Sequence, residues 1–184
     1  MNELFQVAAA VQNFCSLQKW KFCIIGGLAL QRWGEPRVTQ DVDVTLLTGF
    51  GGEETYIETL LRQFPARIEN ARQFAMQNRV LLLKSASGIG IDIALGGLPF
   101  EESVVSRATQ FEYLPKLSLL TCSAEDLIIL KAFADRARDW ADIEGIIIRQ
   151  DNRIDWEYID RHLRPLVDMK EEPQILERLR ELRG

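Results

Sequence analysis

Residues 22–47 read FCIIGGLALQRWGEPRVTQDVDVTLL, and the order of apolar, glycine and acidic residues in this segment sets the expected fold. The apolar run 22–25 ends in Gly26-Gly27, which predicts a buried strand that leads into a tight turn. Residues 28–33 suit a short helix, which the glycine and proline that follow would end. After them the chain is predicted to return to extended structure.

Residues 38–47 alternate between polar and apolar side chains, and this period of two predicts a strand. Asp41 and Asp43 then lie side by side on one face, where two unpaired carboxylates repel each other. A cation between them would relieve that repulsion, and ligands that are all oxygen favour Mg²⁺ or Mn²⁺ over zinc. The alternative is two exposed acids on the polar face of an edge strand.

Asp92 is the third acidic candidate. The apolar runs 80–83 and 89–95 flank a turn rich in serine and glycine, and together they predict a β-hairpin. Asp92 lies between two isoleucines of the second run, so its side chain would point away from the buried face. Taken alone it is a solvated strand residue. Beside an acidic pair it becomes a third metal ligand, or the base that activates an incoming hydroxyl.

The character of the chain changes at Ser123. A serine followed three residues later by Asp126 resembles a capping box, and the chain after it is predicted to be helical almost to its end. We therefore expect an α+β (mixed α/β) core over residues 1–118 and a helical lobe over residues 119–184. The core should contain a small mixed sheet of about four or five strands flanked by helices.

Composition narrows the functional classes. The 184 residues can bury a core without metal or disulfide staples, and the net charge of −5 is a poor match for a dedicated nucleic-acid binder. Cys15, Cys23 and Cys122 are isolated, which argues against zinc and fits a reducing compartment. The single histidine argues against histidine-based catalysis. With no targeting signal and no apolar run of spanning length, we expect a cytoplasmic protein.

The Gly-Gly pair, the short spacer and Asp-x-Asp together resemble the first motif of the polymerase-β-like nucleotidyltransferases. The form Arg-x-Thr-x-Asp-x-Asp, from Arg37 to Asp43, is similar to the AbiEii/AbiGii-type branch, which includes toxins of bacterial toxin–antitoxin systems. Lys131, followed by Asp139 and Asp142, resembles the later motifs of the family. The resemblance spans about residues 22–147 and implies a nucleotidyltransferase-like core whose nucleotide site the helical lobe completes.

The resemblance also implies roles for individual residues. The predicted catalytic residues and ligands of Mg²⁺ or Mn²⁺ are Asp41, Asp43 and Asp92. The predicted nucleotide-binding residues are Gly26, Gly27, Arg37, Thr39, Lys131 and Asp142. Asp139 competes with Asp142 for the role of orienting Lys131 or touching substrate. Lys131, Asp135, Arg138 and Asp142 are also predicted to form a single stripe along one helix.

The implied activity is metal-dependent transfer of a nucleoside monophosphate from an NTP to an acceptor hydroxyl, with release of pyrophosphate. Four alternatives stay open. The first is an RNA-modifying toxin, with tRNA the foremost acceptor, and the second is an enzyme that modifies a protein or small molecule. The third is a nucleotide-binding module of the same fold without turnover. The fourth is one subunit of an assembly with an antitoxin or other partner. We expect no membrane partner.

Overall fold

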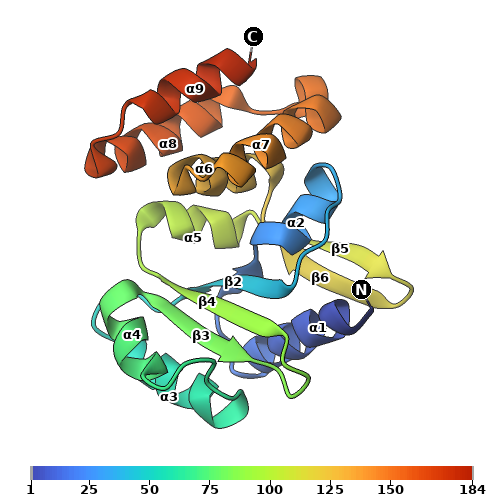
Figure 1. Cartoon of the computed structure of the whole chain (residues 1–184), viewed down its shortest axis with the longest axis vertical. Helices are drawn as coiled ribbons and strands as arrows, with labels where there is room; N and C mark the ends of the chain where they lie inside the picture. Colours follow the sequence, from blue (N-terminus) through green and yellow to red (C-terminus); the bar gives the residue numbers. More distant parts are fainter. Residues whose placement is uncertain (1, 184) are drawn as a thin grey trace. The chain divides into compact units, whose positions relative to one another are not determined.

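The computed structural model describes residues 2–183 (Figure 1). The chain forms two compact units, one of Met1–Leu28 with Val38–Cys122 and one of Ala29–Arg37 with Ser123–Gly184. The sequence placed a single division near residue 118. In the structure the last strand of the sheet continues to Thr121, and residues 29–37 belong to the helical unit although they lie early in the chain.

The first unit is built on a mixed sheet. Within residues 2–183 the sheet has six strands in the order β3-β4-β2-β1-β6-β5. The strands are β1 (Phe22–Ile24), β2 (Asp41–Leu47), β3 (Val80–Lys84), β4 (Gly90–Gly96), β5 (Thr109–Leu114) and β6 (Leu117–Thr121). Strands β3 and β4 are antiparallel, as the hairpin prediction required, whereas β2 and β4 are parallel.

The expectation of four or five strands was too low because β5 was missed. Its sequence, TQFEYL, alternates polar and aromatic residues over positions 110–113, but the strand forms an edge of the sheet and is mostly exposed, so it lacks the apolar run that marked the other strands. The predicted strand 38–47 is also shorter than expected. Strand β2 begins at Asp41, so Thr39 lies in the segment before it.

The core lies on one face of this sheet. Residues from α1 (Asn2–Leu17), α3 (Glu53–Gln63) and α4 (Ala71–Asn78) pack there against fully buried side chains such as Val44 and Ile93. Helix α5 (Pro99–Ser106) contacts β1 and β2. Because side chains alternate along β2, burying the valines turns Asp41 and Asp43 to the opposite face. The apolar pattern thus decides which face carries the acids.

The second unit is helical. Its elements are the later part of α2 (Gly26–Trp33), α6 (Ala124–Ala134), α7 (Ala137–Gln150), η1 (Asp151–Arg153), α8 (Trp156–Lys170) and α9 (Gln174–Arg183). Ser123 is the N-cap of α6, and its hydroxyl accepts a hydrogen bond from Asp126 N–H at 3.1 Å, which confirms the cap predicted there. Across residues 2–183, no helix has the length and apolar character needed to cross a membrane.

The prediction of one helical stripe from Lys131 to Asp142 is wrong. Asp135 has a left-handed backbone with φ of 52°, which ends α6 and separates it from α7. Its carboxylate accepts a hydrogen bond from Trp140 Nε1 at 2.6 Å instead of pairing with Lys131. The turn folds α7 back against α6, so Lys131 faces its partners across two helices rather than along one.

Candidate active site

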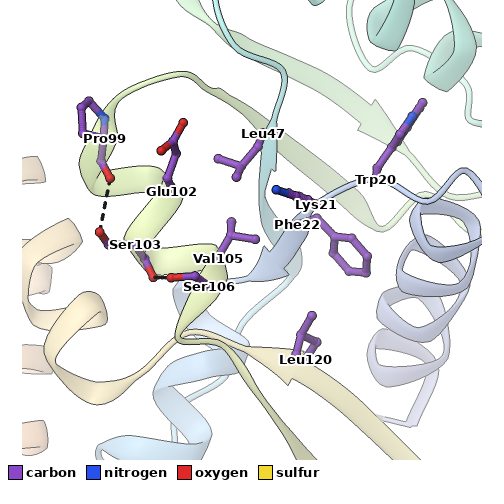
Figure 2. Close-up of a pocket in the computed structure, with 10 residues that line it drawn as sticks. All are labelled: Trp20, Lys21, Phe22, Leu47, Pro99, Glu102, Ser103, Val105, Ser106 and Leu120. Carbon is purple, nitrogen blue, oxygen red and sulfur yellow. Dashed lines mark hydrogen bonds between the residues drawn. The ribbon is translucent and has the colours of Figure 1, made fainter.

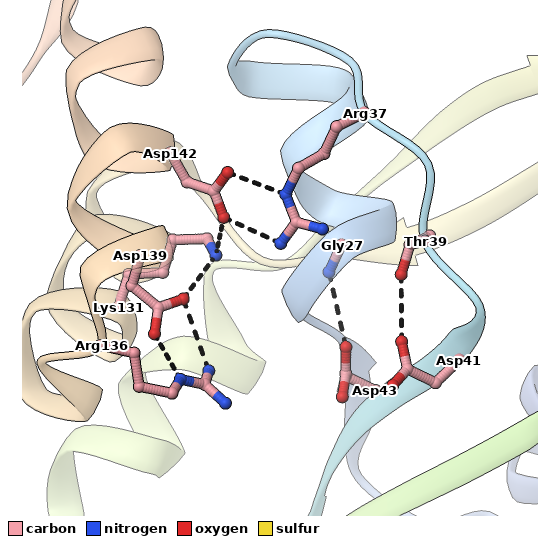
Figure 3. Close-up of polar contacts among 9 residues, drawn as sticks. All are labelled: Gly27, Arg37, Thr39, Asp41, Asp43, Lys131, Arg136, Asp139 and Asp142. Carbon is pink, nitrogen blue, oxygen red and sulfur yellow. Dashed lines mark hydrogen bonds and ion pairs between the residues drawn. The ribbon is translucent and has the colours of Figure 1, made fainter.

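The turn between β1 and α2 needs both of its glycines. Gly26 has φ of +61°, and a Cβ placed on it would overlap the carboxylate of Asp43. A Cβ on Gly27 would overlap the hydroxyl of Thr39. Without those side chains, the backbone at the start of α2 comes close enough for Gly27 N–H to donate to Asp43 Oδ2 at 3.4 Å (Figure 3). The turn therefore lies directly against one of the predicted metal ligands.

The three predicted acids come together on β2 and β4. Parallel pairing places Asp43 opposite Asp92 and Asp41 opposite Gly90. One carboxylate oxygen from each acid lies within 4.8 Å of the other two, which is the proximity that a shared cation requires. Thr39 donates its hydroxyl to Asp41 Oδ1 at 3.0 Å and so orients that carboxylate. Their role as metal ligands stays a prediction.

Arg67, which the sequence did not single out, contacts this acidic group. Its Nη2 lies 2.6 Å from Asp92 Oδ1, yet Oδ1 is buried and accepts no directed hydrogen bond from any described residue. Burial raises the pKa of Asp92, and the charge of Asp41 adds to that effect, while Arg67 opposes it. Asp92 is therefore a stronger base than an ordinary aspartate. Nothing in the sequence around Arg67 marks it, because it reaches Asp92 only through the packing of distant segments.

These residues fit a divalent cation. They supply only oxygen ligands from aspartates, the set that Mg²⁺ and Mn²⁺ prefer. Asp92 Oδ1 lacks a hydrogen-bond donor, and a guanidinium, which is itself a cation, lies beside it. The carboxylates therefore already attract positive charge from the chain, as a metal site is expected to do.

In the second unit, Lys131 is buried in an ion-pair network (Figure 3). Its Nζ donates to Asp139 Oδ1 at 3.0 Å and to Asp142 Oδ2 at 2.6 Å. Arg37 donates two hydrogen bonds to Asp142, from Nε at 2.8 Å and from Nη2 at 2.9 Å. Arg136 donates to Asp139 Oδ2 at 2.5 Å. Both aspartates hold Lys131, and Asp142 also holds Arg37.

This arrangement links residues that the sequence treated separately. Asp139 and Asp142 are not alternatives, since α7 presents both to the same ammonium group. Arg37, which was predicted to bind nucleotide, makes a bidentate pair with Asp142. The sequence did not single out Arg136. It is the N-cap residue of α7, in a turn where one continuous helix had been predicted.

The charge of Asp142 is stabilised by its partners, and this gives a prediction for pH. Burial would raise its pKa, but the hydrogen bonds and charges of Arg37 and Lys131 outweigh burial and lower it. A lowered pKa contributes stability that is present above the unfolded value, about 3.9, and is lost as pH falls through the folded value. Asp142→Asn should therefore be less stable than wild type at pH 7, and the difference should shrink below about pH 4.

Urea unfolding at pH 7, 5, 4 and 3 measures this difference. Asp168→Asn, an exposed aspartate on α8, is the matched control and should follow wild type at every pH. A deficit in Asp142→Asn that is constant across the whole range would show that the charge of Asp142 does not carry the effect.

A separate cavity of about 740 Å³ lies elsewhere in the first unit (Figure 2). Trp20, Phe22 and Leu47 form part of its wall, with polar residues of α5 opposite them. Leu47 ends β2 whereas Asp41 and Asp43 lie near its start, so about 13–20 Å of strand separates this wall of the cavity from the acids. Its size alone therefore does not make it part of the acidic site.

Comparisons with known proteins support the prediction that the protein is a nucleotidyltransferase. A family model described as "Nucleotidyl transferase AbiEii toxin, Type IV TA system" matches residues 13–183. No curated protein matches the sequence. An antigenic nucleotidyltransferase-like protein from Paracoccidioides brasiliensis has a similar structure, with a TM-score of 0.53 and 18% identity over 98% of this chain and 93% of that one. At that identity the likeness shows the fold.

Two further solved structures are similar with lower TM-scores. Lincosamide antibiotic adenylyltransferase LnuA, bound to lincomycin, has a TM-score of 0.47 and 12% identity, over 74% of this chain and 92% of its own. Antibiotic-resistance factor ANT(2'')-Ia has a TM-score of 0.49 and 14% identity, over 97% and 94%. The family model covers most of the chain, including the Gly-Gly and Asp-x-Asp motif and the segment from Lys131 to Asp142. The chain therefore belongs to the AbiEii nucleotidyltransferase family and is a nucleotidyltransferase.

Proposed function

We propose that the protein transfers a nucleoside monophosphate from an NTP to an acceptor hydroxyl, with release of pyrophosphate, and that Mg²⁺ or Mn²⁺ is required. The observation that carries this proposal is the acidic group itself. Asp41, Asp43 and Asp92 bring carboxylate oxygens within 4.8 Å of one another, beside a glycine turn at the start of a helix. A cation-binding group next to backbone N–H groups suits a substrate that carries phosphates.

We assign different catalytic roles to the residues of the first unit. The three aspartates would hold the metal, which when bound polarises the phosphate and lowers the pKa of the acceptor hydroxyl. Asp92, whose carboxylate lies within the same acidic group, would also accept the proton of that hydroxyl. Gly26 and Gly27 lie at the N-terminus of α2, where backbone N–H groups and the helix dipole favour the negative charge of a triphosphate.

Lys131 and Arg37 are proposed to bind nucleotide phosphates. Their network joins three cations, Arg37, Lys131 and Arg136, to two carboxylates, Asp139 and Asp142, so these five side chains carry an excess of positive charge. Asp142 accepts hydrogen bonds from both Lys131 and Arg37, which supports the proposal that it positions the pair. Thr39 would act through Asp41, whose carboxylate it orients.

We further propose that the acceptor is RNA, with tRNA the first to test, and that the protein acts as a toxin with an antitoxin partner. The family description, a toxin of a type IV toxin–antitoxin system, supports the toxin role and the antitoxin partner. Incubation with each of four α-labelled NTPs, Mg²⁺ and either total tRNA, total protein or a panel of antibiotics tests the acceptor. We expect label on tRNA and release of one pyrophosphate for each nucleotide transferred.

Two other results are informative. Label on protein or on an antibiotic would replace RNA as the acceptor but keep the reaction. Binding of NTP without release of pyrophosphate, with every acceptor present, would contradict turnover and identify a nucleotide-binding module. Growth arrest on induction, relieved by a partner gene, would test the toxin role separately.

Metal binding gives a second prediction. Asp41→Asn should weaken Mn²⁺ binding about tenfold or more, because it removes one charged ligand from a group of three. Without metal its stability should equal or exceed that of wild type, since Asp41 repels the charge of Asp92.

Calorimetric titration with Mn²⁺ and thermal unfolding in EDTA measure the two effects, with Asp168→Asn as control. A variant that binds Mn²⁺ normally and loses stability in EDTA would show that Asp41 is structural rather than a ligand.

A further inference from the structure

A hollow of about 410 Å³ opens beside Asp41, and Gln40, Arg67 and the turn 87–90 line it. Gly90 faces this space. A Cβ there would lie only 2.5 Å from Arg67 Nη1 and 3.4 Å from Asp41 Cβ. The missing side chain therefore leaves the room in which the guanidinium lies, next to two of the three acids.

The backbone of Arg67 is anchored beside β3, and this fixes where its side chain starts. Arg67 N–H donates to Leu82 O at 3.0 Å, and Ala66 forms an antiparallel bridge with Leu83, so this segment borders β3. From there the side chain reaches Asp92 on β4, where Nη2 lies 2.6 Å from Oδ1. The side chain remains 33% exposed and lines the hollow, and a guanidinium has five N–H donors, more than its contact with Asp92 uses.

The acidic group thus has two different flanks. In the order β3-β4-β2-β1, the glycine turn follows β1 on one side, and Arg67 borders β3 on the other. In phosphoryl transfer the attacking and leaving oxygens lie roughly in line on opposite sides of the phosphorus. If the triphosphate lies against Gly26 and Gly27, as proposed above, the acceptor enters from the flank of Arg67.

We propose that this hollow is the acceptor subsite and that Arg67 binds a phosphate group of the acceptor, close to its attacking hydroxyl. The inference rests on the proposed function. A guanidinium matches two phosphate oxygens with parallel N–H donors, and it would repel a cationic acceptor. In the transfer, the acceptor oxygen bonds to the α-phosphorus, the bond from that phosphorus to the bridging oxygen breaks, pyrophosphate leaves, and Asp92 takes the hydroxyl proton.

Equilibrium binding tests the subsite without turnover. The probes are a single-stranded RNA dodecamer with a free 3′-hydroxyl, adenosine 5′-monophosphate, and adenosine. Each is titrated into protein saturated with Mn²⁺ and a non-hydrolysable NTP, which keeps the probes out of the nucleotide site. The variants are Arg67→Gln, Arg67→Lys, and Arg62→Gln as an exposed control on α3.

We expect phosphate-bearing probes to bind wild type and the Arg62 control alike, and to bind Arg67→Gln about ten- to a hundredfold more weakly. Arg67→Lys keeps the charge without the fork and should recover part of the loss. NTP affinity should be the same in all four proteins. Binding of RNA but not of the monophosphate identifies a polymer as the source of the phosphate, and binding of both identifies the phosphate ester alone.

Three results would overturn the inference while leaving the proposed function in place. They are adenosine binding as tightly as the phosphate-bearing probes, Arg67→Gln binding like the Arg62 control, and neither phosphate-bearing probe binding wild type although the NTP does. Failure of wild type to bind the NTP with Mn²⁺ would instead contradict the proposed function, and with it the acceptor subsite that rests on that function.

Discussion

Asp43→Asn is expected to lower the rate of nucleotidyl transfer about 10³-fold at saturating NTP, without loss of stability. Asp43 lies at the centre of the acidic group, opposite Asp92 on β4 and against the Gly26 turn. Asparagine has nearly the same shape and can still accept the hydrogen bond from Gly27 N–H. What it lacks is the negative charge that would hold the metal, and metal stabilisation of the transition state is worth several kcal/mol, or about 10³ in rate.

Pyrophosphate release with total tRNA as acceptor measures the rate, and urea unfolding measures the stability. Asp168→Asn makes the same chemical change at an exposed site and should leave both unchanged. If Asp43→Asn keeps a rate within about tenfold of wild type, the transition state does not depend on Asp43, and the assignment of the acidic group as the catalytic centre fails.

Lys131→Met is expected to destabilise the protein by about 3–5 kcal/mol at pH 7, the range for removing one partner of a buried ion pair. Lys131 is only 5% exposed and donates to both Asp139 and Asp142. Methionine keeps the length and apolar volume of the stem but leaves two buried carboxylates facing each other. Arg136 and Arg37 each still hold one of them, which is why we expect a folded variant at lower temperature.

A double variant separates the cause from a general packing defect. Lys131→Met with Asp139→Asn removes one of the two buried carboxylates that lost Lys131 as a partner, so it should recover part of the lost stability. Arg138→Gln, an exposed change on α7, is the control and should cost less than about 0.5 kcal/mol. A loss of that small size in Lys131→Met would show that the network contributes little to folding.

The structure alters how the nucleotide role of Lys131 must be tested. The sequence predicted a nucleotide-binding role for Lys131. The buried network makes a large stability cost the first expectation. Nucleotide titrations of Lys131→Met therefore belong at a temperature at which unfolding is negligible, and affinity that matches wild type there would remove Lys131 from the proposed site.

Features that depend on neighbours along the chain could be predicted from the sequence. The period of two in residues 38–47 places Asp41 and Asp43 on one face, and the two isoleucines around Asp92 turn it away from the core. The Gly-Gly turn, the hairpin of β3 and β4 and the serine cap of α6 are also local. Each rests on side-chain alternation, backbone freedom or a hydrogen bond that spans a few residues, which are encoded in short segments.

Only the tertiary structure decided which residues from distant segments of the chain contact one another. The parallel register of β2 and β4 brings Asp92 to Asp43, and a stretch bordering β3 brings Arg67 to Asp92. The left-handed turn at Asp135 folds α7 onto α6 and buries Lys131 between two aspartates. Such pairings are selected by the packing of apolar faces over the whole core, because a shift of one residue would bury the acids, and no short segment contains that information.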